Sequence, residues 1–173
     1  KLENFELIPF KSLIKQEVNS FMIGHLLFPK IDPVYPATLS KKLVTDLLRV
    51  KLKYDGLVVS DALVMNAISD KYSSAKAAVM AFDAGIDLIM MPKDIDEAIN
   101  SLTDAFYSEE ISLERLYLAR ERRRKQLDLV SNENELKKEE LINEDIKSKF
   151  LLDAFMFSNY IIKNSIFVRG EKK

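Results

Sequence analysis

Three short apolar runs, each preceded by a stretch with helical spacing, constrain the fold of this chain more than any other feature of its sequence. The runs cover residues 21–24, 57–60 and 88–91, and their apolar residues follow one another instead of alternating with polar ones. Such runs are typical of strands in a parallel sheet whose two faces are both covered. Parallel neighbours need long crossovers, which helices usually supply in right-handed βαβ units. The sequence therefore predicts an α/β fold.

Helical spacing and capping residues support this class. Ser73 is a suitable N-cap for one helix, and Gly85 stands just past the end of that helix, where a left-handed C-cap favours glycine. Three prolines make residues 28–38 a long loop, of the kind that often holds functional residues. The helices are expected over residues 7–17, 39–52, 74–84, 94–107 and 112–129.

The composition changes near residue 130. Residues 131–148 are polar and charged, and residues 150–168 bring back aromatic side chains interrupted by polar ones. We therefore expect two parts, an α/β portion over residues 1–130 and a helical C-terminal extension over residues 131–173.

Charge and residue counts exclude several classes of function. Lys+Arg 26 and Asp+Glu 27 leave a formal net charge of −1, which gives no global electrostatic case for nucleic acid or an anionic membrane. No apolar run approaches the ~18–20 residues of a membrane span. Cysteine is absent and His25 is the single histidine, which excludes thiolate zinc sites and metal sites with two imidazoles. With only four glycines there is no glycine-rich phosphate loop, so we expect neither a metal nor a cofactor.

A basic run over residues 120–125 lies on a predicted helix. Acidic residues are its neighbours on that helix, at Glu114, Glu121 and Asp128. The spacing favours a solvated, ion-paired helix face over a phosphate-binding site.

Three positions follow the predicted strands, where parallel α/β folds collect their functional side chains. They are His25, Asp61 and the pair Met91-Pro92, whereas Asp87 precedes its strand and is expected to be structural. Asp61 is the sharpest candidate, because the uncharged strand before it would fix a carboxylate at the rim of a loop. Two structural interpretations stay open. Asp61 can cap the following turn through its own backbone, and His25 can be a hydrogen-bonded structural residue.

Five motifs add a family resemblance to this pattern. They are LIPFK at 7–11, MIGH at 22–25, PATLS at 36–40, DGLVVSDALVM at 55–65 and AGIDLIMMP at 84–92. In this order and spacing they resemble the later part of the catalytic barrel of glycoside hydrolase family three, in the branch of bacterial β-N-acetylglucosaminidases that act on peptidoglycan fragments. The resemblance implies a partial (β/α)8 TIM-barrel-type parallel sheet with about three βα units, followed by C-terminal helices.

The resemblance also implies an activity and roles for single residues. Asp61 matches the catalytic nucleophile, His25 lines the sugar pocket, and Met65 lies on the loop after the nucleophile near that pocket. The implied substrate is terminal β-linked N-acetylglucosamine on cell-wall sugars, hydrolysed with retention of configuration through a glycosyl-enzyme. No cofactor is implied, and the recycling enzymes of this branch suggest a cytoplasmic location.

Other parts of the family's pattern have no counterpart here. The upstream half of the barrel is missing, together with a Lys-His pair that binds sugar and a loop whose Asp-x-His motif supplies the acid/base. Three strands cannot close a barrel. We therefore expect the chain to be the C-terminal portion of a longer enzyme or a truncated relic, inactive alone, with the N-terminal half of the barrel as a candidate partner.

Two alternatives come from other functional classes. One is a non-catalytic remnant of such an enzyme that binds a sugar or a protein. The other is a phosphoacceptor domain in which Asp61 is phosphorylated and Lys93 assists. That alternative needs an acidic pair for magnesium at the first strand end, where His25 stands instead.

Overall fold

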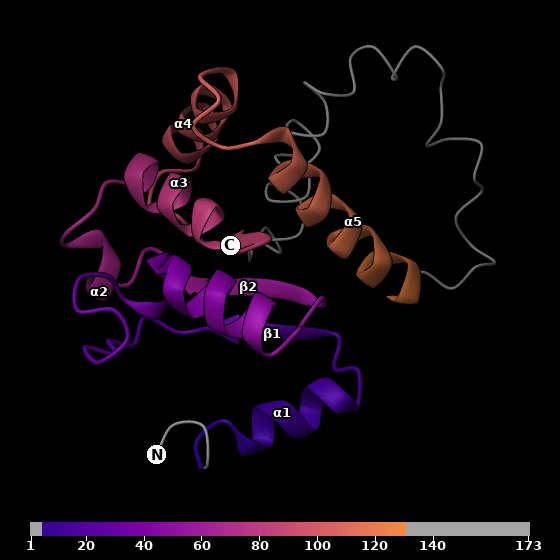
Figure 1. Cartoon of the computed structure of the whole chain (residues 1–173). Helices are drawn as coiled ribbons and strands as arrows, with labels where there is room; N and C mark the ends of the chain where they lie inside the picture. The colour runs from indigo at the N-terminus through magenta and orange to yellow at the C-terminus, as the bar shows by residue number, and fades with distance from the viewer. Residues whose placement is uncertain (1–4, 131–173) are drawn as a thin grey trace, which may run out of the picture. The chain divides into compact units, whose positions relative to one another are not determined.

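Residues 5–130 are described by the computed structural model, and they form a three-stranded sheet with helices around it (Figure 1). The strands are β1 (Ser20–Ile23), β2 (Leu57–Ala62) and β3 (Leu88–Met90), in the spatial order β1-β2-β3. Both pairs of neighbouring strands are parallel. The α/β class and the parallel sheet predicted from the three apolar runs are confirmed.

Helical segments connect the strands, as parallel pairing requires. The segment expected over residues 39–52 is helical but not a regular α-helix. It forms a 3₁₀ turn and then a π-helix, at whose end Leu52 N donates to Leu47 O at 2.9 Å. The helical elements are α1 (Ile8–Lys15), η2 (Ala37–Leu39), η3 (Lys42–Lys51), α2 (Asn66–Ser69), α3 (Ser74–Ala84), α4 (Ile95–Tyr107) and α5 (Leu113–Val130).

Capping residues bound α3, as predicted, and also begin α4. Ser73 Oγ accepts a hydrogen bond from Lys76 N at 3.2 Å, which satisfies a free N–H in the first turn of α3. Gly85 ends this helix with φ at 116°, in the left-handed region. Asp94 caps α4 in the same manner through Glu97 N at 2.9 Å. Local sequence therefore determines where these two helices begin and where α3 ends.

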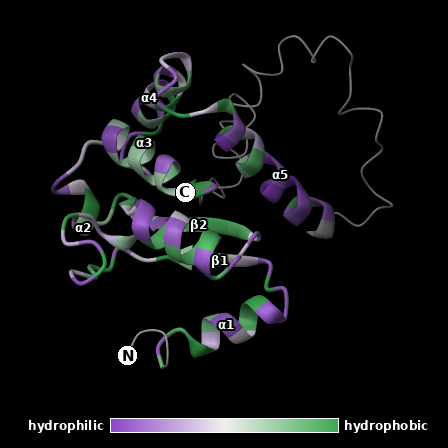
Figure 2. Ribbon diagram, in the orientation of Figure 1, coloured by the Kyte–Doolittle hydropathy of each residue, from purple (hydrophilic) through white to green (hydrophobic). Residues whose placement is uncertain are grey.

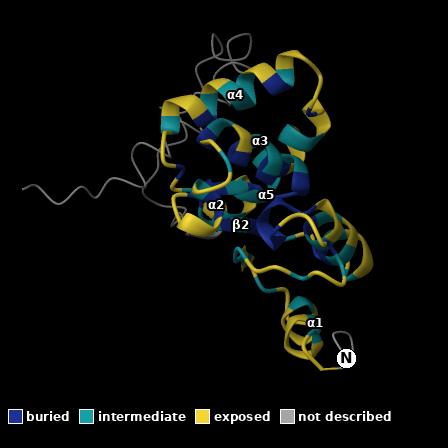
Figure 3. Cartoon of the chain, turned by 90° about the vertical axis from the view of Figure 1, so that its left-hand side faces the viewer, coloured by how far each residue is buried: buried dark blue, intermediate teal, exposed yellow. Residues whose placement is uncertain are grey.

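The two faces of the sheet differ in burial. Val58 on β2 and Ala78 and Ala81 on α3 are all 0% exposed, and Figure 3 shows β2 among buried residues. On the other face, Met22 of β1 pairs in register with Val59 and is 66% exposed. Figure 2 shows that hydrophobic residues line β1 and β2. Within residues 5–130, one face of the sheet is thus covered by helices, and the other is open around Met22.

A cluster of arginines surrounds one carboxylate at the N-terminal end of β3. The side chain of Asp87 is 0% exposed and pairs with Arg49 Nη2, with Arg115 Nη1 at 3.0 Å and with Arg122 Nη1 at 3.4 Å. Its Oδ2 also accepts Val58 N at 3.0 Å. These four bonds tie β2, β3, η3 and α5 together, which gives Asp87 the structural role expected for it. We call Asp87, Arg49, Arg115 and Arg122 the arginine cluster.

The basic run of α5 is only partly the solvated face that its sequence predicts. Arg124 pairs with Glu121 at 3.0 Å and is 55% exposed, as expected. Arg122 is only 13% exposed because it reaches into the arginine cluster and also pairs with Asp55 at 2.8 Å. The prediction of a solvated face is wrong for Arg122, since its partner Asp87 is distant in the sequence.

The described residues up to Gln126 belong to one compact unit. The helical extension predicted over residues 131–173 lies outside the described residues and stays a prediction. No helix of residues 5–130 combines the length and the apolar character that crossing a membrane requires.

Candidate active site

Asp61 lies in β2, at a place where the pairing with β3 is irregular. Val59 pairs with Leu88 and Ala62 pairs with Met90, so β2 spans three steps where β3 spans two. The extra residue makes a β-bulge at Ser60-Asp61, a feature that bends a strand and redirects a side chain. The sequence predicts Asp61 just past the strand, and the structure extends the strand through it.

The carboxylate of Asp61 is half-buried, with one oxygen bound and one free. Oδ1 accepts a hydrogen bond from the N–H of the next residue, Ala62, at 2.8 Å. Within residues 5–130, Oδ2 makes no hydrogen bond. Asp61 therefore bonds the local backbone, as the structural interpretation of this residue predicts. This bond occupies a single oxygen and leaves the other for a ligand.

His25 follows β1 and uses both ring nitrogens to bind the protein. Nε2 lies 3.0 Å from Ala62 O, and because a carbonyl oxygen only accepts, Nε2 must donate. Nδ1 lies 2.8 Å from Thr38 Oγ1, which in turn lies 3.0 Å from Ile23 O. The ring therefore joins the ends of β1 and β2 directly beside Asp61. This geometry fits the interpretation of His25 as a hydrogen-bonded structural residue, and its contact with a sugar stays a prediction.

Met65 lies on the loop after Asp61, at the start of α2, and is 46% exposed. This loop is tied to the end of β3, because Leu63 N donates to Met90 O and Val64 N donates to Met91 O, both at 2.9 Å. Met91 itself has φ at 44°, a left-handed conformation that is uncommon for a residue other than glycine and often marks functional sites. The structure thus places His25, Asp61 and Met65 at the same end of the sheet.

The proline-rich loop is held by Asp32, which is not among the site residues predicted from the sequence. Asp32 is 4% exposed, and its Oδ1 accepts Val34 N at 3.0 Å and Tyr35 N at 3.2 Å. Its Oδ2 accepts the hydroxyl of Ser40 at 2.6 Å, and this bond is the main reason why the pKa of Asp32 is lowered. In the sequence, Asp32 directly precedes Pro33. An aspartate at such a position is typical of a turn whose backbone N–H groups bond to the side chain. Asp32 thereby fixes the loop that delivers Thr38 to His25.

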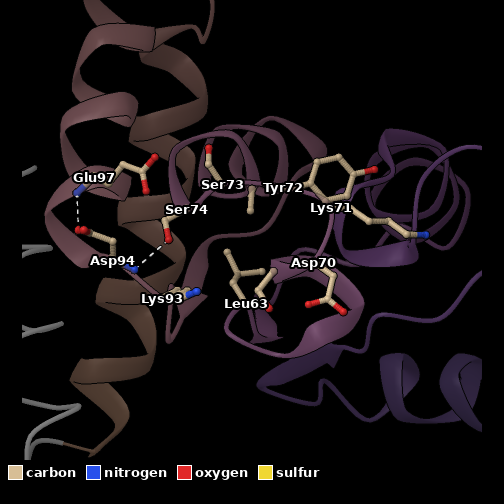
Figure 4. A pocket seen from close by; sticks show the side chains of 11 residues that line it. Leu63, Asp70, Lys71, Tyr72, Ser73, Ser74, Lys93, Asp94 and Glu97 are labelled. Carbon is tan, nitrogen blue, oxygen red and sulfur yellow. Dashed lines mark hydrogen bonds between the residues drawn. The ribbon is translucent and has the colours of Figure 1, made fainter.

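A hollow of about 610 Å³ opens near the same end of the sheet (Figure 4). Its wall includes Leu63 from the loop after β2 and Lys93 and Asp94 from the loop after β3. Neither Asp61 nor His25 is part of this wall, so the hollow is separate from the predicted site. Residues 5–130 contain no cluster of three or more histidine, aspartate or glutamate side chains that could hold a metal ion.

Comparisons with known proteins agree on one family. Residues 1–127 match the family model described as glycosyl hydrolase family 3 N terminal domain. The chain is 31% identical over 137 residues to beta-hexosaminidase A of Pseudoalteromonas piscicida. This alignment covers 67% of this chain and 23% of that protein. The chain is also 35% identical over 107 residues to a beta-hexosaminidase of Shewanella frigidimarina. That alignment covers 61% of this chain and 31% of the relative.

Solved structures give the same result. A glycoside hydrolase family 3 beta-N-acetylglucosaminidase from Paenibacillus sp. strain FPU-7 matches with a TM-score of 0.69 and 33% identity, over 92% of this chain and 31% of that one. The beta-N-acetylglucosaminidase of Thermotoga maritima matches with a TM-score of 0.68 and 28% identity, over 73% of this chain and 29% of that one. The chain therefore spans less than a third of each of these four relatives.

Proposed function

The chain belongs to glycosyl hydrolase family 3, and from this membership we propose that it supplies the nucleophile of a retaining β-N-acetylglucosaminidase. The relatives named beta-hexosaminidase and beta-N-acetylglucosaminidase support hydrolysis of a β-linked hexosaminide. The proposed substrate is terminal N-acetylglucosamine on cell-wall sugars, and the proposed location is the cytoplasm. Both proposals come from the branch of the family that the sequence resembles.

The placement of Asp61 supports this proposal more than any other observation. The residue lies at the C-terminal end of a parallel strand, where barrel enzymes of this type keep their catalytic groups. The β-bulge turns the strand at this residue, and one carboxylate oxygen has no partner within residues 5–130. A nucleophile needs such a free oxygen on a rigid support.

The proposed first step forms a covalent glycosyl-enzyme. An oxygen of Asp61 donates an electron pair to the anomeric carbon, and the bond from that carbon to the leaving oxygen breaks, with its electron pair going to the leaving oxygen. In the second step water attacks the same carbon from the opposite face and gives a proton to the group that acted as acid in the first step. The bond from that carbon to Asp61 breaks, and its electron pair returns to the carboxylate. Two inversions give net retention of configuration.

The first step on a natural sugar also needs an acid to protonate the leaving oxygen. His25 is a poor candidate, because its Nε2 donates to Ala62 O and its Nδ1 faces Thr38 Oγ1. We propose that the acid comes from outside residues 5–130, in the N-terminal half of the barrel. The open sheet face around Met22 supports this proposal, because additional strands and their side chains would cover it.

A non-catalytic remnant is the second candidate function. The engagement of both nitrogens of His25 favours it, because His25 is then poorly placed to protonate the leaving oxygen of a natural sugar. Such a protein could still bind a sugar or another protein at the open face of the sheet.

An activated substrate distinguishes the two candidates. A dinitrophenyl N-acetyl-β-glucosaminide has a leaving group that departs without protonation, so the first step does not require an acid. Intact-mass spectrometry of the full chain should then show one added N-acetylglucosaminyl group. Asp61→Asn should abolish the adduct, whereas Asp70→Asn, which changes an exposed aspartate nine positions further on, should leave it intact. A chain that is folded by circular dichroism and forms no adduct would support the non-catalytic remnant.

A further inference from the structure

Ser60, the residue before Asp61, forms an unusual link across the β-bulge. Its side chain is 0% exposed, and its hydroxyl oxygen accepts a hydrogen bond from Met90 N at 2.8 Å. Bulges interrupt the regular ladder between two strands, so backbone groups opposite them need other partners. Here the partner is a side chain of the bulge itself. Ser60 therefore bonds β2 to β3 at the point where their main-chain register shifts.

The residue on the other side of Asp61 is held just as firmly. Ala62 O accepts a hydrogen bond from His25 Nε2 at 3.0 Å, which binds β2 to the end of β1. Asp61 thus lies between two anchored neighbours, Ser60 fixed to β3 and Ala62 fixed to the residue that follows β1. Within residues 5–130, the carboxylate of Asp61 itself bonds only the adjacent backbone N–H. The direction of its free oxygen therefore depends on the backbone that the two neighbours hold.

We propose that Ser60 is a positioning residue, whose bond to Met90 N keeps the β-bulge in the shape that aims the carboxylate of Asp61 at the anomeric carbon. The inference rests on the proposed function, in which Asp61 is the nucleophile. Nucleophilic attack is sensitive to placement, and an error of about 1 Å can cost about 10²-fold in rate. Loss of the Ser60 hydroxyl should therefore slow the chemical step more than it weakens sugar binding.

Ser74 provides a matched control. Its side chain is also buried, and its hydroxyl oxygen also accepts a backbone N–H, from Asp94 at 2.8 Å. It lies at the start of α3 in the wall of the hollow, a wall to which Asp61 does not contribute. Ser60→Ala and Ser74→Ala therefore remove the same kind of hydrogen bond, but only the first lies beside Asp61.

The test measures the rate of adduct formation on the full chain with the dinitrophenyl substrate, at several substrate concentrations. Ser60→Ala should lower the maximal rate about 10- to 100-fold, with little change in the concentration that gives half the maximal rate. Ser74→Ala should leave both values unchanged for each folded molecule. Should Ser60→Ala fail to fold, Ser60→Cys keeps a weaker acceptor of similar shape and should give an intermediate rate.

The possible results separate this inference from the proposed function. A normal rate in Ser60→Ala, or equal slowing in Ser74→Ala, overturns the role of Ser60 and leaves Asp61 as the nucleophile. No adduct in the unsubstituted, folded chain overturns the proposed function and the role of Ser60 with it. Hydrogen exchange gives a further check, because the amide of Met90 should exchange much faster in Ser60→Ala, and unchanged exchange would also contradict the inference.

Discussion

Replacing Asp87 by asparagine removes the negative charge at the centre of the arginine cluster while keeping the shape of the side chain. The carboxylate meets Arg49, Arg115 and Arg122, and their side chains are only 10%, 15% and 13% exposed. Burial lowers the pKa of Arg49 and Arg115, and the neighbouring charge of Asp87 opposes that effect. Without Asp87, three guanidinium groups would share a poorly hydrated space with no carboxylate among them except Asp55 at its edge.

The expected loss of stability is large. Removing one partner of a buried ion pair costs about 3–5 kcal/mol, because the remaining charge stays buried and uncompensated. Asparagine can still accept hydrogen bonds through its side-chain oxygen, so we expect Asp87→Asn to lose about 3 kcal/mol. That is a substantial fraction of the ~5–15 kcal/mol that stabilises a typical domain.

Urea denaturation followed by circular dichroism measures this loss as a change in the free energy of unfolding. Asp83→Asn is the matched control, since Asp83 pairs with Lys41 at 2.8 Å on the surface, where the two side chains are 39% and 61% exposed. An exposed pair of this kind contributes about 0–1 kcal/mol. If Asp87→Asn unfolds with the same midpoint as Asp83→Asn, the structural role assigned to the arginine cluster is wrong.

Two further predictions concern the backbone and the response to acid. Gly85→Ala should destabilise the fold by about 1–3 kcal/mol in urea denaturation. The reason is that Gly85 has φ at 116° and that an added Cβ would lie 2.9 Å from Val44 Cγ1. An unchanged midpoint of unfolding would contradict this prediction. The pKa of Asp32 is lowered mainly by the hydrogen bond from the Ser40 hydroxyl. The ionised carboxylate therefore stabilises the fold at pH values above its ordinary pKa of about 4. This contribution is lost as the pH falls through the lowered pKa of the folded state. Unfolding free energies measured between pH 6 and the acid limit should therefore fall less steeply below about pH 4 in Asp32→Asn, and identical slopes would refute the assignment.

Much of the fold follows from local sequence. The three strands come from short apolar runs, and α3 begins and ends at residues suited to its caps, Ser73 and Gly85. These features depend on neighbours within a few positions, so a single sequence is enough to predict them. The place of Asp61 at the end of β2 follows from the same local pattern.

Other features of the site depend on residues far apart in the chain. The β-bulge at Ser60-Asp61 arises from the register between β2 and β3, and Ser60 and Met90 are 30 positions apart. The bond from His25 to Ala62 O joins residues 37 positions apart, and no local sequence pattern predicts it. The solvated face predicted for Arg122 is wrong for the same reason, because its partner Asp87 lies 35 positions away.

The central claim is that Asp61 is the group that attacks the sugar. The most direct measurement treats the folded full chain with the dinitrophenyl N-acetyl-β-glucosaminide, digests it at acidic pH and locates the added sugar by tandem mass spectrometry. If Asp61 is the nucleophile, the sugar will be attached to the carboxylate of Asp61 and to no other side chain. Attachment at another carboxylate, with Asp61 unmodified, would contradict it.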